Sequence, residues 1–279
     1  MRIGLMTDLH LGLSGRPTWY NRLLGDHAET IAATAVEALQ RAGVDLVVIL
    51  GDISNAGLAS ELESARGIFS ALRMPWYVIP GNHDADAVRS GAFDAAFGPH
   101  AARGYLRCGE VGMLFVRDTS PDGSPASTSF LVGSGQSSEL ATVLAGDEPR
   151  AVMVFTHAPL LSAKTCADTH GGKYAGHFAD GADLLGRLAA GGASCRPMAF
   201  CGHLHFHHVI HAPRWAQCVT GALIEYPMEF RAVTLVGDTV KIETLPSVSP
   251  GLQAESLISA DTAWVAGEPR DRQWEGVGM

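Results

Sequence analysis

Five short apolar runs in this chain each end in residues that commonly bind metals, and this pairing limits the possible folds more than any other feature. Buried strands of an α/β sheet have this continuous apolar character. Open α/β sheets bind their ligands beyond the strand ends. We therefore expect five strands that bring five polar motifs to one sheet edge. The runs and their motifs are Ile3 to Met6 with Asp8-Leu9-His10, Leu46 to Leu50 with Gly51-Asp52, Trp76 to Ile79 with Gly81-Asn82-His83-Asp84, Val152 to Phe155 with His157, and Met198 to Cys201 with Gly202-His203-Leu204-His205.

The residue types in these motifs favour a metal site. Alternate residues of an extended chain point the same way, so Asp8 and His10 are expected to reach one site together. His203 and His205 repeat that spacing with two imidazoles. Each motif is weakly specific alone, and the signal lies in the ordered set. Carboxylate, amide oxygen and imidazole together suit manganese, iron, zinc or cobalt, and affinity order does not choose among them.

Composition excludes several classes of protein. A chain of 279 residues with 47% hydrophobic content favours one large domain over two. Five cysteines without a Cys-x-x-Cys pair predict no disulfide framework and a cytoplasmic, reducing location. We find no signal-peptide pattern and no apolar run near the ~20 residues that span a bilayer, so no membrane partner is expected. A net charge of −9 without basic clusters argues against duplex nucleic acid.

The pattern of apolar residues predicts a layered α/β domain. Strand and helix alternate through the first half, which is the βαβ pattern. The second half ends in a meander of short strands, in which Gly237-Asp238 is a hairpin turn signal. We expect one domain over residues 1–245 and a partly flexible extension over 246–279. The further expected elements are helices at about 27–42, 59–72 and 135–145, and strands at 111–118, 209–211, 217–220, 232–236 and 240–244.

The ordered motifs, which span residues 8–205, resemble those of the calcineurin-like metallophosphoesterases. Within that family, Thr7-Asp8-Leu9-His10-Leu11 and Gly81-Asn82-His83-Asp84 look most like the cyclic-nucleotide and glycerophosphodiester phosphodiesterase branch. The resemblance implies an α/β fold, a four-layer α/β/β/α sandwich with two packed mixed sheets. It also implies two divalent or trivalent metal ions. Asp8, His10 and His205 would bind one ion, Asn82, His157 and His203 the other, Asp52 would bridge both, and His83 would contact the phosphate or the leaving group.

The expected function is hydrolysis of a small-molecule phosphodiester by attack of a metal-bridging hydroxide. Two metals lower the pKa of a bound water, and His83 can donate a proton to the leaving oxygen. Two cations also leave the site positive after Asp8 and Asp52 are counted, so an acidic protein can still bind phosphate. A phosphomonoesterase or a nucleotide pyrophosphatase remains the alternative. A nuclease or a non-catalytic scaffold carries less weight, and a homodimer stays open.

Several residues near the motifs have two interpretations. The segment from Ser162 to Gly181 contains His170, Lys173, Tyr174 and His177, and it is either a substrate-binding loop or a solvated loop. His207, His208 and His211 follow a ligand set that is already complete, so ordinary strand histidines are the simpler reading. Cys201 is expected to be a small core residue.

Overall fold

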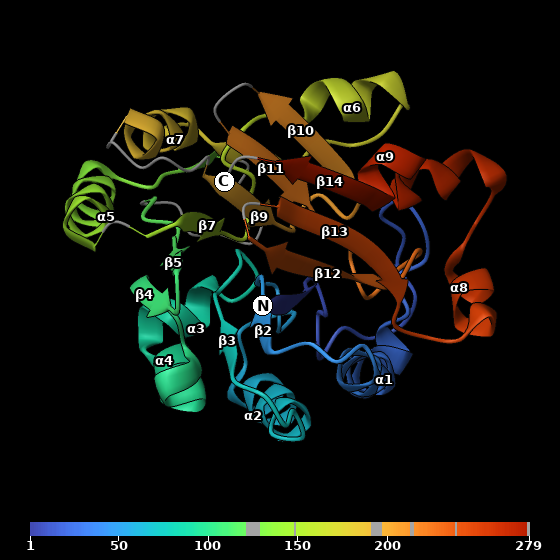
Figure 1. Ribbon diagram of the computed structural model, residues 1–279. Helices are drawn as coiled ribbons and strands as arrows, with labels where there is room; N and C mark the ends of the chain where they lie inside the picture. The colour runs from blue at the N-terminus through green and yellow to red at the C-terminus, as the bar shows by residue number, and fades with distance from the viewer. Residues whose placement is uncertain (121–128, 148, 191–196, 213–214, 238, 278–279) are drawn as a thin grey trace.

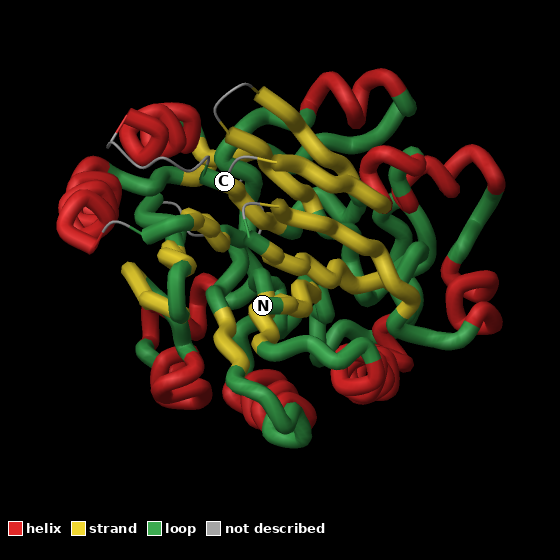
Figure 2. Tube along the Cα trace, in the orientation of Figure 1, coloured by secondary structure: helices red, strands yellow, loops and turns green. Residues whose placement is uncertain are grey.

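The computed structural model describes residues 1–120, 129–147, 149–190, 197–212, 215–237 and 239–277. It contains two six-stranded mixed sheets packed face to face, with helices on their outer sides (Figure 1, Figure 2). The first sheet has the order β14-β13-β12-β1-β2-β3, in which β1, β2 and β3 are parallel and the other pairs antiparallel. Its strands are β1 (Arg2–Met6), β2 (Leu46–Ile49), β3 (Trp76–Val78), β12 (Glu229–Val236), β13 (Thr239–Pro246) and β14 (Gln273–Val277).

The second sheet has the order β10-β11-β9-β7-β5-β4. Its four inner strands are parallel, and each edge strand pairs antiparallel with its neighbour. The strands are β4 (Gly104–Cys108), β5 (Val111–Phe115), β7 (Ala151–Phe155), β9 (Met198–Cys201), β10 (His208–Ala212) and β11 (Trp215–Val219). A short parallel pair, β6 (Ser129–Phe130) and β8 (His177–Phe178), lies apart from both sheets.

Helices complete the outer two layers, and the expected four-layer sandwich is confirmed. One apolar cluster joins the first sheet to α1, α2 and α4, and another joins the second sheet to α5 and α7. In Figure 1, α1, α2 and α4 lie along the lower side of the sheets, and α5 and α7 lie at the left. The helices are α1 (Ala28–Arg41), α2 (Ala59–Phe69), α3 (Ala85–Ser90), α4 (Ala92–Phe97), α5 (Ser134–Asp147), α6 (Lys164–Thr169), α7 (Gly181–Ala190), α8 (Pro250–Ser256) and α9 (Pro269–Arg272), with 3₁₀ turns at Gly25–His27, Gly98–His100 and Ala260–Ala266.

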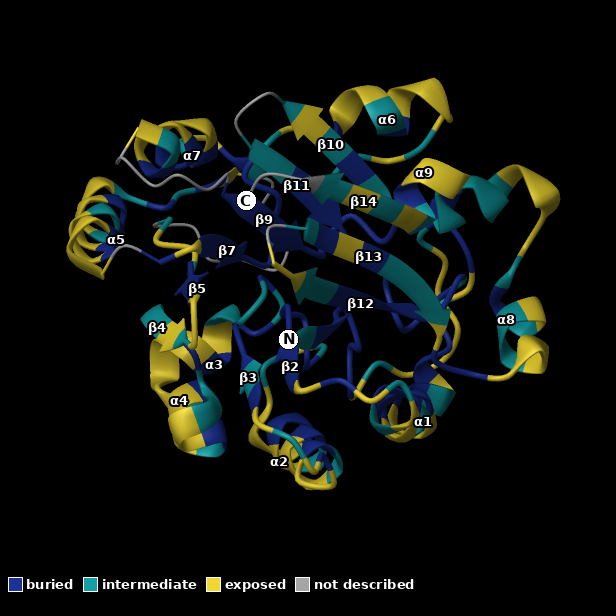
Figure 3. Ribbon diagram, in the orientation of Figure 1, coloured by how far each residue is buried: buried dark blue, intermediate teal, exposed yellow. Residues whose placement is uncertain are grey.

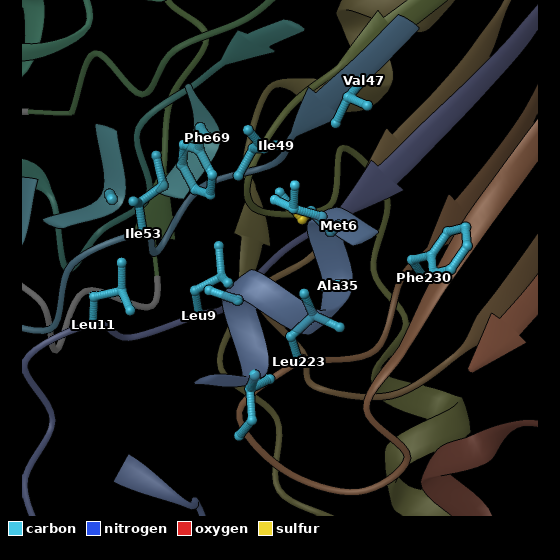
Figure 4. Packing of buried hydrophobic residues seen from close by; sticks show 14 of the residues in the cluster. Met6, Leu9, Leu11, Ala35, Val47, Ile49, Ile53, Phe69, Leu223 and Phe230 are labelled. Carbon is cyan, nitrogen blue, oxygen red and sulfur yellow. The ribbon is translucent and has the colours of Figure 1, made fainter. Parts of the chain in front are cut away.

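The inner strands β1, β2, β5, β7 and β9 are buried on both faces, which explains their continuous apolar sequences (Figure 3). In β1, Ile3 and Leu5 join the cluster between the sheets, while Met6 joins the cluster beneath the helices. Figure 4 shows part of that second cluster, where Phe69 of α2 and Phe230 of β12 lie on either side of the β1–β2 region. Full burial of each such side chain stabilises the fold by about 1.5–3 kcal/mol.

The five motif-bearing strands do not share one sheet, which corrects the sequence expectation. Strands β1, β2 and β3 belong to the first sheet, and β7 and β9 belong to the second. The motifs still meet, because loops at one end of the stacked sheets approach each other. The backbone N–H of His203, after β9, donates to Asp8, after β1. The site therefore lies across the end of the sandwich.

The segment beyond residue 245 packs onto the sandwich. The boundary expected there falls at the end of β13, and β14 pairs with β13 at the edge of the first sheet. Val265 is fully buried beside Leu204 and Phe206. Among the described residues, no helix is both long and apolar enough to cross a membrane. Cys108, Cys166, Cys201 and Cys218 are free thiols, and Cys195 lies outside the described residues.

Removing Arg272 is expected to destabilise the protein. Its two terminal nitrogens each lie 2.7 Å from a different carboxylate oxygen of Glu229, which is 8% exposed. Arg272→Ala should lower the free energy of unfolding in urea by about 3 kcal/mol, the low end for a broken buried pair because Arg272 still contacts water. The control is Arg270→Ala in the same helix, whose ion pair with Glu268 is exposed and whose loss should cost under about 0.5 kcal/mol. Equal losses for the two variants would contradict this assignment.

Candidate metal centre

The motif residues sit on an unusual backbone. Asp8, His10, Asp52, His203 and His205 all have φ between 45° and 68°, in the left-handed region. Residues other than glycine seldom adopt this conformation, which costs of order 1–3 kcal/mol at each position. The extended conformation expected for the two alternating motifs is therefore wrong, because the chain curls over the strand ends. Their side chains converge nonetheless.

Backbone hydrogen bonds hold the first two motifs together. The N–H groups of Leu9 and His10 both donate to the carbonyl of Asp52, and that of Asp8 donates to Gly51. The backbone of Gly81, in a neighbouring motif, packs so closely against Asp52 that no side chain fits there. A Cβ on Gly81 would lie 2.2 Å from Oδ1 of Asp52. Glycine at the motif positions thus serves close approach of the backbone to the ligand side chains.

One group of candidate ligands comprises Asp8, His10 and His205. Their ligand atoms all lie within 4.8 Å of one another, and all three residues are buried. Nε2 of His205 is 3.4 Å from Oδ1 of Asp8. The other oxygen of Asp8 accepts hydrogen bonds from the hydroxyl of Thr7 at 2.8 Å and from the N–H of His203 at 3.0 Å. The carboxylate is thereby oriented with one oxygen toward the imidazoles.

The second group comprises Asp52, His157 and His203, again within 4.8 Å. Asn82 adjoins it, since its Oδ1 lies 3.1 Å from Nε2 of His157. Nδ1 of His203 is 3.2 Å from the same His157 nitrogen. A single oxygen of Asp52, Oδ2, lies 3.3 Å from Nε2 of His157 and 3.7 Å from Nε2 of His10. Asp52 therefore stands between the two groups, where a bridging ligand would be.

Two buried atoms support a fit to cations. Oδ1 of Asp8 and Nε2 of His10 are buried and have no hydrogen-bond partner within the described part of the chain. An unsatisfied buried polar group costs about 1–3 kcal/mol. Both atoms face the ligand groups, and a cation would satisfy them. The mixed oxygen and nitrogen donors suit transition metals.

The outward nitrogens of the imidazoles are held by acceptors. Because a carbonyl or an ionised carboxylate oxygen can only accept, each of these ring nitrogens carries the proton and leaves the other nitrogen directed to the centre. Such outer partners fix the orientation and tautomer of metal-binding histidines. The pairs are Nδ1 of His157 with the carbonyl of Leu50 at 2.7 Å, Nε2 of His203 with the carbonyl of Ala175 at 3.1 Å, Nδ1 of His83 with the carbonyl of Asn55 at 2.8 Å, and Nδ1 of His205 with the carboxylate of Glu225 at 2.6 Å.

The buried carboxylates and imidazoles of the centre shift one another's pKa. Burial alone would lower the pKa of His157 and of His205, but Asp52 raises the first to about 9 and Asp8 raises the second to about 10. Burial alone would raise the pKa of Asp8, but His205 lowers it to about 2. Burial lowers the pKa of His10 to about 3. The carboxylates thus stay ionised and attract positive charge, whether protons or cations.

His83 lies beside the candidate ligands, whereas Asp84 joins two of the loops that carry them. The His83 ring lies edge-on to His10 with centroids 4.6 Å apart, and His83 forms a third group with His10 and Asp52. Its backbone N–H donates to Oδ1 of Asp52 at 2.9 Å. Asp84 is fully buried and accepts from the backbone N–H groups of Ser54 and Gly81, so it ties the two loops together.

A cavity of about 500 Å³ opens beside the ligands. Of the loop residues with two interpretations, Tyr174 lines it, and the Lys173 ammonium lies 4.6 Å from the ring centroid of Trp19, another lining residue. His177 contacts the hydroxyl of Tyr174. His170 instead stacks on Trp264 with centroids 4.7 Å apart.

The later histidines and Cys201 do not line that cavity. His207 is buried, and its Nδ1 accepts from the N–H of Gly221, with burial lowering its pKa to about 4. His208 lies 3.2 Å from Asp271. Cys201 is buried in an apolar cluster, as expected.

Glu225 and Trp19 adjoin the ligands but were not predicted from the sequence. Glu225 is fully buried beside His205, and it also accepts the backbone N–H of Asn21. A lone carboxylate in the apolar stretch Ala222 to Tyr226 is the only local signal for it. Trp19 lies in a loop without motif character, so only the fold reveals its place.

The fold and the ligand groups define a sandwich protein with a candidate two-metal centre. The chain belongs to the calcineurin-like phosphoesterase family, whose model matches residues 1–206. It is 26% identical over 162 residues to a protein of Fibrobacter succinogenes named "Probable cyclic nucleotide phosphodiesterase", with 58% of each chain covered. It is 51% identical over 43 residues to a glycerophosphodiester phosphodiesterase of Enterobacter lignolyticus, covering 15% of this chain and 16% of that protein. These matches span less than two thirds of either relative.

Solved structures share the fold. A dimetal phosphatase from Danio rerio superposes with a TM-score of 0.66 at 15% identity, covering 89% of this chain and 96% of that one. A purple acid phosphatase from yellow lupin (Lupinus luteus) superposes with a TM-score of 0.59 at 12% identity, covering 88% of this chain and 51% of that one. At these identities the likeness concerns the fold alone.

Glu225 is expected to strengthen metal binding through His205. Glu225→Gln keeps an oxygen acceptor of nearly the same shape but removes the charge that makes the imidazole more basic. Loss of such an outer partner typically weakens metal affinity about 10–100-fold. Competition with a chelator would measure it. Glu110→Gln is the control, since Glu110 is exposed and paired with Arg150. Unchanged affinity in Glu225→Gln would contradict this role.

Proposed function

We propose that this protein is a metal-dependent phosphoesterase that hydrolyses a small-molecule phosphodiester. The observation that carries the proposal is the position of Asp52, one oxygen of which lies between His10 of one ligand group and His157 of the other. Membership of the calcineurin-like phosphoesterase family supports it. The names of the curated relatives favour a diester over a monoester.

In this proposal Asp8, His10, Asp52 and His205 would hold one cation, and Asp52, Asn82, His157 and His203 would hold the other. Two bound cations would polarise the phosphoryl oxygens and allow water to act as a nucleophile at neutral pH. The protein's part is to fix these ligands in advance. The acceptors on the outer ring nitrogens and the left-handed backbone do so before substrate binds.

His83 is proposed to assist departure of the leaving group. Its Nδ1 donates to the carbonyl of Asn55, and His83 lines the cavity beside the ligands. When the ring is protonated, Nε2–H can donate to an oxygen of the substrate. A proton donated there neutralises an alkoxide as the P–O bond breaks.

A panel assay tests the proposed function. Purified protein loaded with manganese, iron, zinc or cobalt is given cyclic nucleotides, glycerophosphodiesters, monoesters and dinucleotides, while metal content is measured. We expect two ions per chain and a higher kcat/KM for a diester than for the matching monoester. Higher kcat/KM for monoesters or nucleoside diphosphate esters would favour the alternative activities. No hydrolysis of any ester by protein with two bound ions would favour the non-catalytic scaffold.

A further inference from the structure

The cavity beside the metal ligands is lined by apolar side chains as well as by the ligands. Its polar lining includes candidate ligands together with His83 and Asn55. A small alcohol group on the phosphate, such as glycerol, would leave the apolar lining in contact with water, whereas a flat ring system would cover part of it. A volume of about 500 Å³ falls in the range of small-molecule sites. The apolar lining includes Leu13, Pro17, Trp19, Leu23 and Tyr174.

Trp19 is partly buried and lines the cavity. The indole lies close to the centre, with its ring centroid 6.3 Å from that of His205. A ligand that reaches the metals from this side therefore passes the indole.

The loop that carries Trp19 is firmly held. Thr18 and Arg22 form an antiparallel bridge around it, and the Tyr20 hydroxyl donates to the carbonyl of Lys173. The side-chain oxygen of Asn21 accepts from the hydroxyl of Thr262 at 2.6 Å. The segment beyond residue 245 therefore helps to hold the loop in place through this hydrogen bond. A wall that is ordered in advance binds a ligand at a lower entropic cost.

We infer that Trp19 is the specificity residue that binds the nucleobase of a nucleotide phosphodiester. The base packs against the face of the indole, and the phosphate lies at the metal ligands. The Lys173 ammonium lies over the indole ring, 4.6 Å from its centroid, and adds a positive charge beside Trp19. This inference rests on the proposed function, and it selects nucleoside esters over glycerol esters.

Two diesters that share the same leaving group test the contact between the base and Trp19. Thymidine 5′-(4-nitrophenyl phosphate) and methyl 4-nitrophenyl phosphate both release nitrophenolate and differ only in the group expected to meet Trp19. In the manganese-loaded enzyme, Trp19→Ala should lower kcat/KM about 10–100-fold for the thymidine ester, the usual range for base stacking on an aromatic ring. For the methyl ester the change should be less than about twofold, since no base is present. Trp19→Phe should retain part of the preference, and Trp274→Phe in β14 should change neither rate.

A binding measurement separates this inference from the proposed activity. Thymidine 5′-monophosphate should quench tryptophan fluorescence in the wild type and in Trp274→Phe, but much less in Trp19→Phe, while methyl phosphate should not. If neither diester were hydrolysed and the Trp19-dependent quenching persisted, the base site would stand and the proposed activity would fail. The inference would be overturned if Trp19→Ala lowered kcat/KM equally for both esters or changed it for neither. Quenching that does not depend on Trp19 would also overturn it.

Discussion

Replacing Asp52 by asparagine is expected to abolish nearly all activity and to lower the number of bound metal ions below two. Asparagine keeps the shape and can still accept the backbone N–H of His83, which donates to Oδ1. It removes the negative charge that lies between His10 and His157. Removal of one preorganised electrostatic group from an active site, such as an oxyanion-hole donor, costs about 10²–10³-fold in kcat. Because Asp52 is placed to serve both cations, we expect a loss of at least about 10³-fold.

Variants of ligands that belong to only one group show whether the large effect is specific to Asp52. His10→Ala and His203→Ala each remove a side chain from a single group and should lose less activity than Asp52→Asn. Asp26→Asn, at an exposed carboxylate, should match the wild type in rate and metal content. Metal analysis of each purified variant gives the ion number directly. Two ions and more than a tenth of the activity in Asp52→Asn would show that the carboxylate does not bridge.

The strand ends were predictable because each depends on local sequence. A run such as Leu46–Ile49 is buried on both faces, so its residues are all apolar, and the first polar residues after it mark its end. Helix α1 was predicted within one residue at each end, since its buried positions repeat at helical spacing. These signals need no knowledge of distant contacts.

The assignment of each strand to one of the two sheets was not predictable in the same way. Strand β1 pairs with β2, the next strand in the sequence, and with β12, which begins at Glu229. A buried run looks alike in either sheet, so its composition does not say which neighbours it has. The same limit hid Glu225, whose role depends on a contact with His205 that the sequence does not encode locally.

The backbone conformation of the ligands also escaped the sequence. Asp8 and His10 are not residues that favour positive φ strongly enough to predict it. The strained conformation persists because the surrounding contacts fix it, including hydrogen bonds from Leu9 and His10 to Asp52. The alternating residues were expected to converge because the chain was taken to be extended. They do converge, but they do so from a left-handed backbone.

His83→Ala is expected to keep both metal ions and to lose rate according to the leaving group. Positioned acid–base groups typically contribute about 10²–10⁴-fold, and an alkoxide needs a proton as it departs. Nitrophenolate departs without one, so a nitrophenyl diester should lose much less kcat than an alkyl diester. His100→Ala is the matched control, because Nδ1 of His100 likewise donates to a backbone carbonyl, that of Trp76, but the ring stacks on Trp76 outside the ligand groups. Equal losses for the two diesters would show that His83 does not protonate the leaving group, and loss of a metal ion would identify it as a ligand instead.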